Sequence, residues 1–403
     1  MDAAEVRRDF PLLSEGEDRK PPIYFDSACQ TLRPRCVIDA MTEYYESTPA
    51  CAGRSSHRLA TEVSLKCDDV RAEAASFFGA ADPAEIAFLK NATEGLNTVI
   101  FGSGLARGDE VVTTDYEHNS VHVPLLRAAE MYGIRRRIVR SSSDGTFDLE
   151  AFEEALSDNT RLVSMCLTSN VTGYTLPARE IVEIAHSRGA QVLFDAAQTA
   201  PSTHIDVGSL DVDYLVVSAH KMLGPSGLGI MYAKNESSRH LTPLAYGGHG
   251  VTGVTLDSFE LLPPPERFEA GLQNYSGIIG AGAAIRYLDR IGLDAVAEHE
   301  WALNRRMTKA LRGVDGIRIL SPADPNLRGG ILSFNIKEMV PHDVAMILDN
   351  SRNIMVRAGM HCCNSLFESR RIDGAVRASL YIYNTTGEVD EFIQAMEDMS
   401  QKF

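Results

Sequence analysis

Short runs of apolar, often β-branched residues alternate with amphipathic stretches along the first 234 residues of the chain. The apolar runs predict strands at 85–89, 110–114, 162–167, 191–194, 214–217 and 229–232. The stretches between them predict helices at 94–101, 121–131, 149–156 and 179–187. Regular alternation of this kind is typical of an α/β protein with a largely parallel sheet.

The pattern changes in the segment 246–266, which has glycines at one end and three consecutive prolines at the other. Such a segment predicts a loop or hairpin followed by a boundary. Beyond it, the pattern predicts helices at 276–291, 293–311 and 388–399 and strands at 317–320 and 330–336. We therefore expect a large domain over 20–265 and a smaller α+β domain formed by 1–19 and 266–403.

The composition is that of a globular protein, with 44% hydrophobic and 23% charged residues among 403. The formal net charge is −16, and the excess acid is spread without a tail or block. A net acidic chain has no bulk attraction for nucleic-acid phosphates or anionic lipids. No stretch approaches the ~20 apolar residues of a membrane span, and the N-terminus lacks the pattern of a secretory signal. We expect a cytoplasmic protein with no nucleic-acid or membrane partner.

Seven cysteines are present, an odd number that does not favour a disulfide framework in a chain of this size. The four N-terminal ones, Cys29, Cys36, Cys51 and Cys67, are separated by 6, 14 and 15 residues and contain no CxxC pair. That spacing gives weak support to a metal site. We expect small buried thiols there and no bound metal.

Two predicted strands end in residues that carry chemistry. One strand ends in Asp195, and another ends in the sequence SAHK, which places Lys221 just beyond it. In open α/β sheets, ligands bind outside the carboxyl ends of strands. An amine and a carboxylate at one edge suit pyridoxal phosphate (PLP): the lysine forms a Schiff base, and the aspartate pairs with the pyridinium nitrogen. Gln198, three residues after Asp195, can reach the ring hydroxyl.

Each of these residues also has a simpler explanation. Asp195 could cap a helix, and Lys221 could be a solvated surface lysine. Taken alone, an aspartate at a strand end is more often structural. The combination with SAHK and the following glycine-rich turn GPSGLG favours the cofactor site.

A phosphate needs its own binding site, and the segment 90–97 follows a strand and opens a helix. Free N–H groups at a helix N-terminus and the hydroxyl of Thr93 suit a phosphate dianion. Ser218 and His220 can add donors, although for the segment taken alone an ordinary threonine N-cap is the preferred explanation. His118 follows another strand and can stack on the cofactor ring, although a lone histidine is more often an ordinary polar residue.

Together these segments resemble the class V, fold-type I PLP enzymes, and within them the cysteine desulfurases of the SUF type. The matching motifs run in the family order over nearly the whole chain: YFDSACQTLRP, NATEG, EHNS, SNVTG, FDAAQ, SAHKMLGPSGLG, RAGMHC and VRASLYIYN. The resemblance implies a large domain with a mainly parallel sheet flanked by helices, plus a smaller C-terminal α+β domain.

The resemblance also implies roles for individual residues. The residues that hold PLP would be Lys221, Asp195, His118, Asn170, Gln198, Thr93, Ser218 and His220. Among them, Asn170 and Gln198 would touch the ring oxygen, and His118 would stack on the ring. Arg377 would clamp the substrate carboxylate with Arg357 beside it, since a guanidinium matches a carboxylate bidentately. The residues that act on the substrate would be Lys221, His118 and the nucleophile Cys362.

The implied reaction is the removal of sulfur from L-cysteine, which leaves L-alanine and a persulfide on Cys362. The persulfide would serve iron–sulfur cluster assembly or another sulfur-transfer pathway through an acceptor or scaffold protein. The nucleophile must be a thiolate. Family members are homodimers with the active site at the interface, and the segment 267–274 would reach the partner's phosphate.

Cys362 and Cys363 are adjacent thiols. In an extended segment, adjacent side chains face opposite sides. The family register then directs Cys362 toward the cofactor and Cys363 away from it. We expect Cys363 to be a small buried residue, with a resolving thiol as the alternative.

Five positions depart from the family pattern. Met360 replaces a histidine, Cys363 an alanine, Leu272 a threonine, Gly53 a histidine, and Cys29 a small residue. None of these changes removes a core catalytic group.

Three alternatives remain open. The same residues suit a selenocysteine lyase, or a class V epimerase, transaminase or lyase that does not use the thiol. A protein that has lost catalysis and serves as a binding partner in sulfur trafficking is a third possibility. Such a protein would have no need to retain Lys221, Asp195 and Arg377 together.

Overall fold

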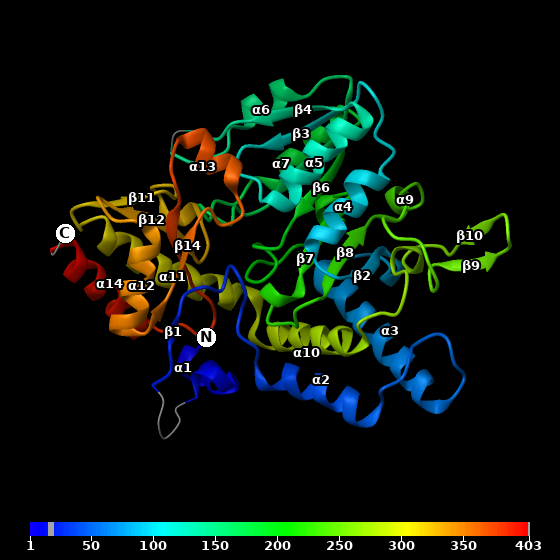
Figure 1. Ribbon diagram of the computed structural model, residues 1–403, viewed down its shortest axis with the longest axis horizontal. Helices are drawn as coiled ribbons and strands as arrows, with labels where there is room; N and C mark the ends of the chain where they lie inside the picture. Colours follow the sequence, from blue (N-terminus) through cyan, green and yellow to red (C-terminus); the bar gives the residue numbers. More distant parts are fainter. Residues whose placement is uncertain (15–19, 143, 402–403) are drawn as a thin grey trace.

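The computed structural model describes residues 1–14, 20–142 and 144–401, and a seven-stranded sheet forms its centre (Figure 1). The strand order is β2-β8-β7-β6-β5-β3-β4. The strands are β2 (Ile86–Leu89), β3 (Glu110–Thr114), β4 (Arg135–Val139), β5 (Thr160–Cys166), β6 (Gln191–Asp195), β7 (Tyr214–Ser218) and β8 (Gly229–Ala233). β8 runs antiparallel to both of its neighbours, while β3 to β7 are parallel. The expected α/β architecture with a mainly parallel sheet is confirmed.

Helices cover both faces of this sheet (Figure 1). The longer ones are α2 (Arg35–Ser47), α3 (Arg58–Phe78), α4 (Ala92–Gly102), α5 (Asn119–Tyr132), α6 (Leu149–Ala155), α7 (Ala178–Ser187) and α10 (Tyr275–Ile291). Two single-turn helices, α8 (Val207–Leu210) and α9 (Asn235–Ser238), lie in the connections. A parallel sheet needs this cover because crossover helices pack on its faces and both faces are apolar.

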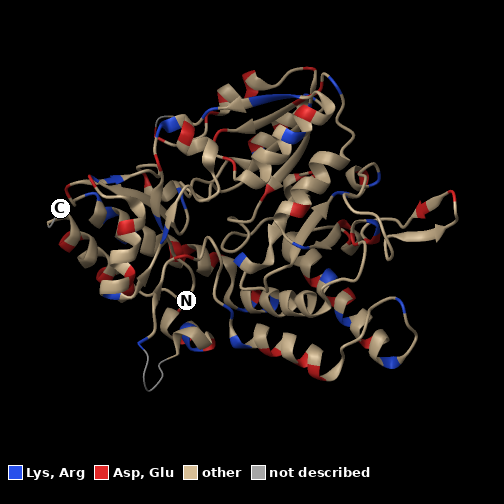
Figure 2. Ribbon diagram, in the orientation of Figure 1, with Lys and Arg blue, Asp and Glu red and all other residues tan. Residues whose placement is uncertain are grey.

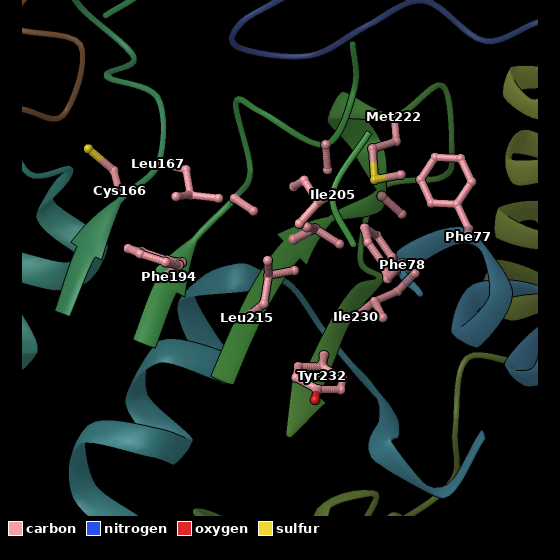
Figure 3. Close-up of a cluster of buried hydrophobic side chains, with 14 of the residues drawn as sticks. Phe77, Phe78, Cys166, Leu167, Phe194, Ile205, Leu215, Met222, Ile230 and Tyr232 are labelled. Atoms are coloured by element: carbon pink, nitrogen blue, oxygen red, sulfur yellow. The ribbon is translucent and has the colours of Figure 1, made fainter. Parts of the chain in front are cut away.

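Alternation along the strands divides the core in two, because successive side chains of a strand point to opposite faces. Figure 3 shows one face, where Phe194, Leu215 and Ile230 gather with Phe78 of α3. The neighbouring residues belong to the other core, under α4 and α5: Leu193, Val216, Met231, Leu96 and Leu125. The backbone of each strand is therefore held between two apolar layers.

The edge strand β4 was missed by the sequence pattern because it reads RRRIV. Arg135 and Arg137 form ion pairs with the buried Glu110 on β3, both at 3.1 Å. The charge of this strand is visible at the sheet edge in Figure 2. Charged residues on an edge strand discourage pairing with another chain.

A second, antiparallel sheet has the order β11-β12-β15-β14. Its strands are β11 (Ile317–Ile319), β12 (Ile331–Ile336), β15 (Ala375–Ser379) and β14 (Arg357–Gly359), and it packs with α11 (Leu293–Leu311), α12 (Pro341–Arg352) and α14 (Thr386–Ser400). The short strand β1 (Ile23–Tyr24) pairs with β13 (Ile354–Met355), and Phe25 enters the same apolar core as Phe334 and Phe392. Residues from the beginning of the chain thus complete the C-terminal layer.

The division of the chain at residue 265 remains a prediction. α10 follows that point in sequence, yet it packs against α2 and α3 beside the large sheet (Figure 1). At the N-terminus, α1 (Ala3–Val6) leads to Arg7, which pairs with Glu388 at 2.7 Å, and to Phe10, which packs on Tyr383. The predicted small-domain segment 1–19 extends over 15–19, which lie outside the described residues.

The segment 246–266 contains a hairpin of β9 (Val251–Val254) and β10 (Phe259–Leu261) that projects from the body of the molecule (Figure 1). Leu256 at its tip is fully exposed, and Phe259 is largely exposed. Within the described ranges, no helix is both long and apolar enough to cross a membrane.

Candidate active site

A cavity of about 250 Å³ opens at the carboxyl ends of β6 and β7, where the large sheet meets β14 and β15. All the site residues predicted from the sequence line this cavity: Thr93, His118, Asn170, Asp195, Gln198, Ser218, His220, Lys221, Arg357, Cys362 and Arg377. They come from seven separate segments of the chain. The structure therefore brings together all the residues that were predicted from the sequence to bind the cofactor or act on the substrate.

Lys221 lies in the 3₁₀ turn Ala219–Lys221 that directly follows β7. Burial lowers the pKa of its amine, Asp195 opposes that shift, and Arg377 adds to it. Among the described residues, the amine has no hydrogen-bond partner. A lysine with a lowered pKa and a free amine is suited to nucleophilic addition to a carbonyl.

Asp195 ends β6 and is buried, and its Oδ1 accepts a hydrogen bond from the N–H of Ala197 at 3.0 Å. A second carboxyl, that of Glu117, lies in the same buried region and accepts hydrogen bonds from Thr114 Oγ1 and the Cys166 N–H. Burial raises the pKa of Glu117 to about 8. Glu117 is thus mostly protonated near neutral pH and adds little negative charge beside Asp195.

His118 caps the N-terminus of α5 through its ring. Its Nδ1 accepts from the Ser120 N–H at 3.1 Å and lies 2.8 Å from Ser120 Oγ. Burial, with the nearby cation of Lys221, lowers the pKa of His118 to about 4. The ring is therefore neutral at physiological pH, and with Nδ1 accepting, the proton is assigned to Nε2.

The N-terminus of α4 forms the wall that is suited to an anion. Asn91, and not Thr93, is the helix cap, since its Oδ1 accepts from the Glu94 N–H at 2.9 Å. The simpler explanation of Thr93 as an N-cap is therefore wrong. The Ala92 N–H donates to Ser218 Oγ at 2.9 Å, which joins the two segments.

At this wall, close packing against Asn91 leaves no space for a side chain at Gly229. A Cβ on Gly229 of β8 would lie 2.5 Å from the Asn91 backbone. The Thr93 hydroxyl lies 2.7 Å from Ser120 Oγ. Burial lowers the pKa of His220 to about 4, so the imidazole ring of His220 is neutral at physiological pH. Hydroxyls, a neutral imidazole and a helix N-terminus together make a wall that is suited to a phosphate.

The two arginines are opposite each other on the antiparallel pair β14 and β15. Arg377 is 2% exposed; its Nη2 donates to Asp26 Oδ1 at 3.2 Å and its Nη1 to the Asn170 carbonyl at 2.9 Å. The buried Nε of Arg377 has no partner among the described residues. Arg357 Nη1 donates to Cys29 Sγ. The cavity thus presents two guanidinium groups at one end, and one of them keeps an unused donor.

Cys362 lies in a loop that is not extended, contrary to the expectation for this segment. His361 and Cys362 have φ angles of 50° and 55°, which place both in the left-handed region. Asn170 Nδ2 donates to the His361 carbonyl at 2.7 Å, and the Asn119 N–H donates to the Cys362 carbonyl at 2.6 Å. These bonds hold a backbone conformation that is costly for residues other than glycine.

The loop separates the two adjacent thiols. Cys362 is exposed and lines the cavity. Cys363 is fully buried just before α13 (Asn364–Arg370), where its Sγ donates to the Tyr116 and Glu117 carbonyls at 3.2 and 3.3 Å. Burial also raises the pKa of the Cys363 thiol. The opposite orientation of the two side chains arises from this turn, not from strand alternation.

His361 is another cavity residue that the sequence did not assign to the site. Its Nε2 lies 3.0 Å from the Ala375 carbonyl and therefore carries the proton, while the buried Nδ1 has no partner among the described residues. Burial, then Arg377, lowers the pKa of His361 to about 3. A neutral His361 supplies no charge to the neighbouring thiol.

The side-chain amides of Asn170 and Gln198 each donate one hydrogen bond within the protein. Asn170 holds the His361 carbonyl, and Gln198 Nε2 donates to the Ala28 carbonyl at 2.8 Å. Their predicted contacts with a cofactor ring oxygen would use the remaining donors.

The expectation of small buried thiols among the N-terminal cysteines is wrong for three of the four. Cys67 is buried, Cys36 and Cys51 are exposed, and Cys29 is half-buried on the cavity wall. The described residues contain no group of three or more His, Cys, Asp or Glu side chains able to hold a metal ion.

Known proteins are similar to this chain over nearly its whole length. The model of the family "Aminotransferase class-V" matches residues 23–392. A cysteine desulfurase of Enterobacter sp. (strain 638) is 38% identical over 397 residues, covering 98% of this chain and 97% of that protein. A probable cysteine desulfurase of Synechocystis sp. (strain PCC 6803) is 36% identical over 399 residues, covering 98% of this chain and 95% of that protein.

Solved structures agree with the sequence relatives. The apo structure of a cysteine desulfurase from Thermococcus onnurineus NA1 superposes with a TM-score of 0.94 at 37% identity, covering 99% of this chain and 98% of that chain. The expected fold-type I architecture is thereby confirmed. Since the family model covers most of the chain and the relatives align almost end to end, this chain belongs to the class V aminotransferase family.

Proposed function

We propose that this protein is a PLP-dependent cysteine desulfurase, which converts L-cysteine to L-alanine and leaves the sulfur as a persulfide on Cys362. One observation carries the proposal: an exposed thiol, a buried arginine and a free lysine amine line one cavity. The relatives at 36–38% identity are named cysteine desulfurases, which supports the same reaction. The SUF-type subclass is part of this proposal.

The residues of the cavity fit PLP. The Lys221 amine is free of hydrogen bonds among the described residues, Asp195 supplies a carboxylate at the neighbouring strand end, and the α4 N-terminus suits the phosphate. When bound, PLP supplies a ring that withdraws electrons from the substrate Cα. Asp195 would hold the ring nitrogen in its protonated form, and the neutral His118 would stack on the ring.

The protein's own groups then perform four tasks. Arg377 binds the substrate carboxylate, and Lys221 moves the proton from Cα. The Cys362 thiolate attacks the substrate sulfur, so that an S–S bond forms as the substrate C–S bond breaks. Lys221 returns a proton to Cα and a second proton reaches the former Cβ, which completes alanine, and the sulfur remains on Cys362.

The proposal includes a homodimer, a sulfur-acceptor or scaffold protein, and a cytoplasmic location. Leu272 is 70% exposed in the segment 267–274, and the hairpin carries the exposed Leu256 and Phe259. Large exposed apolar side chains of this kind mark protein interaction surfaces. They support a subunit interface on the side of the molecule that carries the hairpin.

The deciding experiment is incubation of the purified protein with L-cysteine and reductant, with alanine and sulfide both measured. Equal amounts of the two products are expected. Alanine formation that survives removal of every thiol would indicate a class V enzyme that does not use the thiol. Selenocysteine as a parallel substrate separates desulfurase from selenocysteine lyase activity.

Arg377→Ala is expected to raise the KM for cysteine by an amount equivalent to about 2–5 kcal/mol, the range for truncating one member of a buried charge pair. The substrate carboxylate then loses its charged partner, and the buried Asp26 loses its own partner. Steady-state kinetics measure the effect. Arg357→Ala is the matched comparison, since a KM that responds only to Arg357→Ala assigns the clamp to Arg357.

Asn170→Ala is expected to slow alanine formation by about 100-fold, since small misplacements of reacting groups have effects of that size. The reason is that Asn170 holds the His361 carbonyl and thereby positions Cys362. Gln198→Ala is the matched comparison, because Gln198 shares the predicted ring contact and does not touch the loop. The rate of Cys362 alkylation by iodoacetamide should change in Asn170→Ala alone; equal changes in both variants would contradict a positioning role.

A further inference from the structure

We infer that Cys29 is a second sulfur-carrying thiol of this site, which takes the sulfane sulfur from Cys362 and frees Cys362 for another turnover. The inference rests on the proposed desulfurase function. Three cysteines line the cavity: Cys29, Cys166 and Cys362. Cys166 is 4% exposed and packed in the core, whereas Cys29 and Cys362 are accessible from the cavity.

The position of Cys29 is held from several sides. It ends a turn in which its N–H donates to the Asp26 carbonyl at 3.0 Å. The turn is attached to β15, because the Ala28 N–H donates to Ser379 Oγ at 2.9 Å. From the turn after β6, Gln198 Nε2 donates to the Ala28 carbonyl at 2.8 Å. The sulfur is therefore presented to the cavity by a fixed backbone.

The same strand segment positions both thiols. Arg357 on β14 donates from Nη1 to Cys29 Sγ, and the chain continues from β14 through Gly359 directly into the loop that carries Cys362. Both sulfurs also lie close enough to the Lys221 amine to influence its pKa. Cys29 and Cys362 therefore open on the same cavity, and Arg357 contacts the sulfur of Cys29 there.

The transfer needs no outside oxidant. The Cys29 thiolate attacks the terminal sulfur of the Cys362 persulfide, a new S–S bond forms on Cys29, and the Cys362–sulfur bond breaks. Cys362 leaves as a thiolate, and the proton from Cys29 passes to solvent. One persulfide is consumed and one is formed, so the oxidation level of the pair does not change.

No other cysteine combines these features. Cys363, the adjacent thiol, is buried and its Sγ donates to two carbonyls. Cys36 and Cys51 are exposed but do not line this cavity. The resolving role that the sequence offered as an alternative for Cys363 is therefore better suited to Cys29.

The test is the alanine burst of the PLP-loaded enzyme with excess L-cysteine and no reductant. Each sulfur carrier accepts one sulfur, so we expect about two alanines per subunit for the unaltered protein and about one for Cys29→Ser. The serine hydroxyl keeps an acceptor for Arg357, so the variant removes the thiol chemistry and retains the contact. Cys36→Ser removes a thiol outside the cavity and should retain a burst of about two.

Mass spectrometry of the alkylated persulfides locates the sulfur. We expect sulfane sulfur on both the Cys29 and Cys362 peptides of the unaltered protein, and none on Cys29 in Cys362→Ala. A burst of one with all sulfur on Cys362, or a second sulfur added to Cys362 itself, overturns the relay and leaves the desulfurase intact. Absence of alanine refutes the proposed function instead.

A measurement without turnover tests the pair directly. Diamide, a thiol oxidant, should convert Cys29 and Cys362 of the holoenzyme to a disulfide that peptide mapping detects. Cys29→Ser should form none at Cys362. Failure of the unaltered protein to form this disulfide contradicts the inference whether or not cysteine is a substrate.

Discussion

Lys221→Ala is expected to abolish the visible absorbance of bound PLP and all turnover of L-cysteine. Lys221 is the single lysine that lines the cavity in the described part of the chain, and its amine is free of hydrogen bonds there. Removing it eliminates both the covalent attachment of the cofactor and the group that moves the substrate α-proton. Absorbance spectra and alanine assays on the purified variant measure the two effects.

Lys234→Ala is the matched control, because Lys234 also follows a strand of the central sheet but pairs with Asp211 on the surface. It should retain both colour and activity. A yellow, active Lys221→Ala protein would contradict the assignment of the site.

Cys362→Ala is expected to reduce sulfide release and protein-bound persulfide to background while the PLP absorbance remains. The thiol is exposed on the cavity wall, and no predicted PLP-binding residue depends on its side chain. The left-handed turn at His361 and Cys362 is held through backbone carbonyls, so removing the sulfur retains these bonds. Sulfide assays and mass spectrometry after a cysteine pulse are the measurements.

Cys363→Ala separates a loss of the nucleophile from a loss of structure. Its Sγ donates to two carbonyls in a buried site, so the variant should lower the free energy of unfolding by about 1–2 kcal/mol. Desulfuration should remain largely intact. Sulfur trapped mainly on Cys363, or normal desulfuration by Cys362→Ala, would overturn the assignment.

Much of the site was predictable because its chemistry lies at strand ends. Asp195 and Lys221 each follow an apolar run, and the carboxyl ends of parallel strands meet at one edge of a sheet. Their proximity therefore depends only on the hydrophobic pattern and on parallel pairing. The apolar runs also located six of the seven central strands, and the seventh, β4, escaped because its arginines pair with Glu110 at an edge.

Other features depended on contacts between distant segments. The sequence indicated that Cys362 and Cys363 face different ways, but the reason was a left-handed turn held by Asn170 and Asn119, which no local pattern reveals. The pairing of Asp26 with Arg377 joins residues 351 apart in sequence. The protonation state of Glu117 is a further example, because its raised pKa results from burial and cannot be read from the residue type.

The amino-acid sequence by itself determined the α/β class and the position of Lys221 and Asp195 at strand ends, because these follow from periodicity and local order, whereas Cys362 was indicated as the nucleophile only by the family resemblance. Only the tertiary structure decided which cysteines line the cavity. Cys29 and Cys67 occur in the same N-terminal third of the chain, yet one lines the cavity beside Arg357 and the other is packed in the core. That difference arises from the docking of the turn after β1 onto β15, a contact between the two ends of the chain.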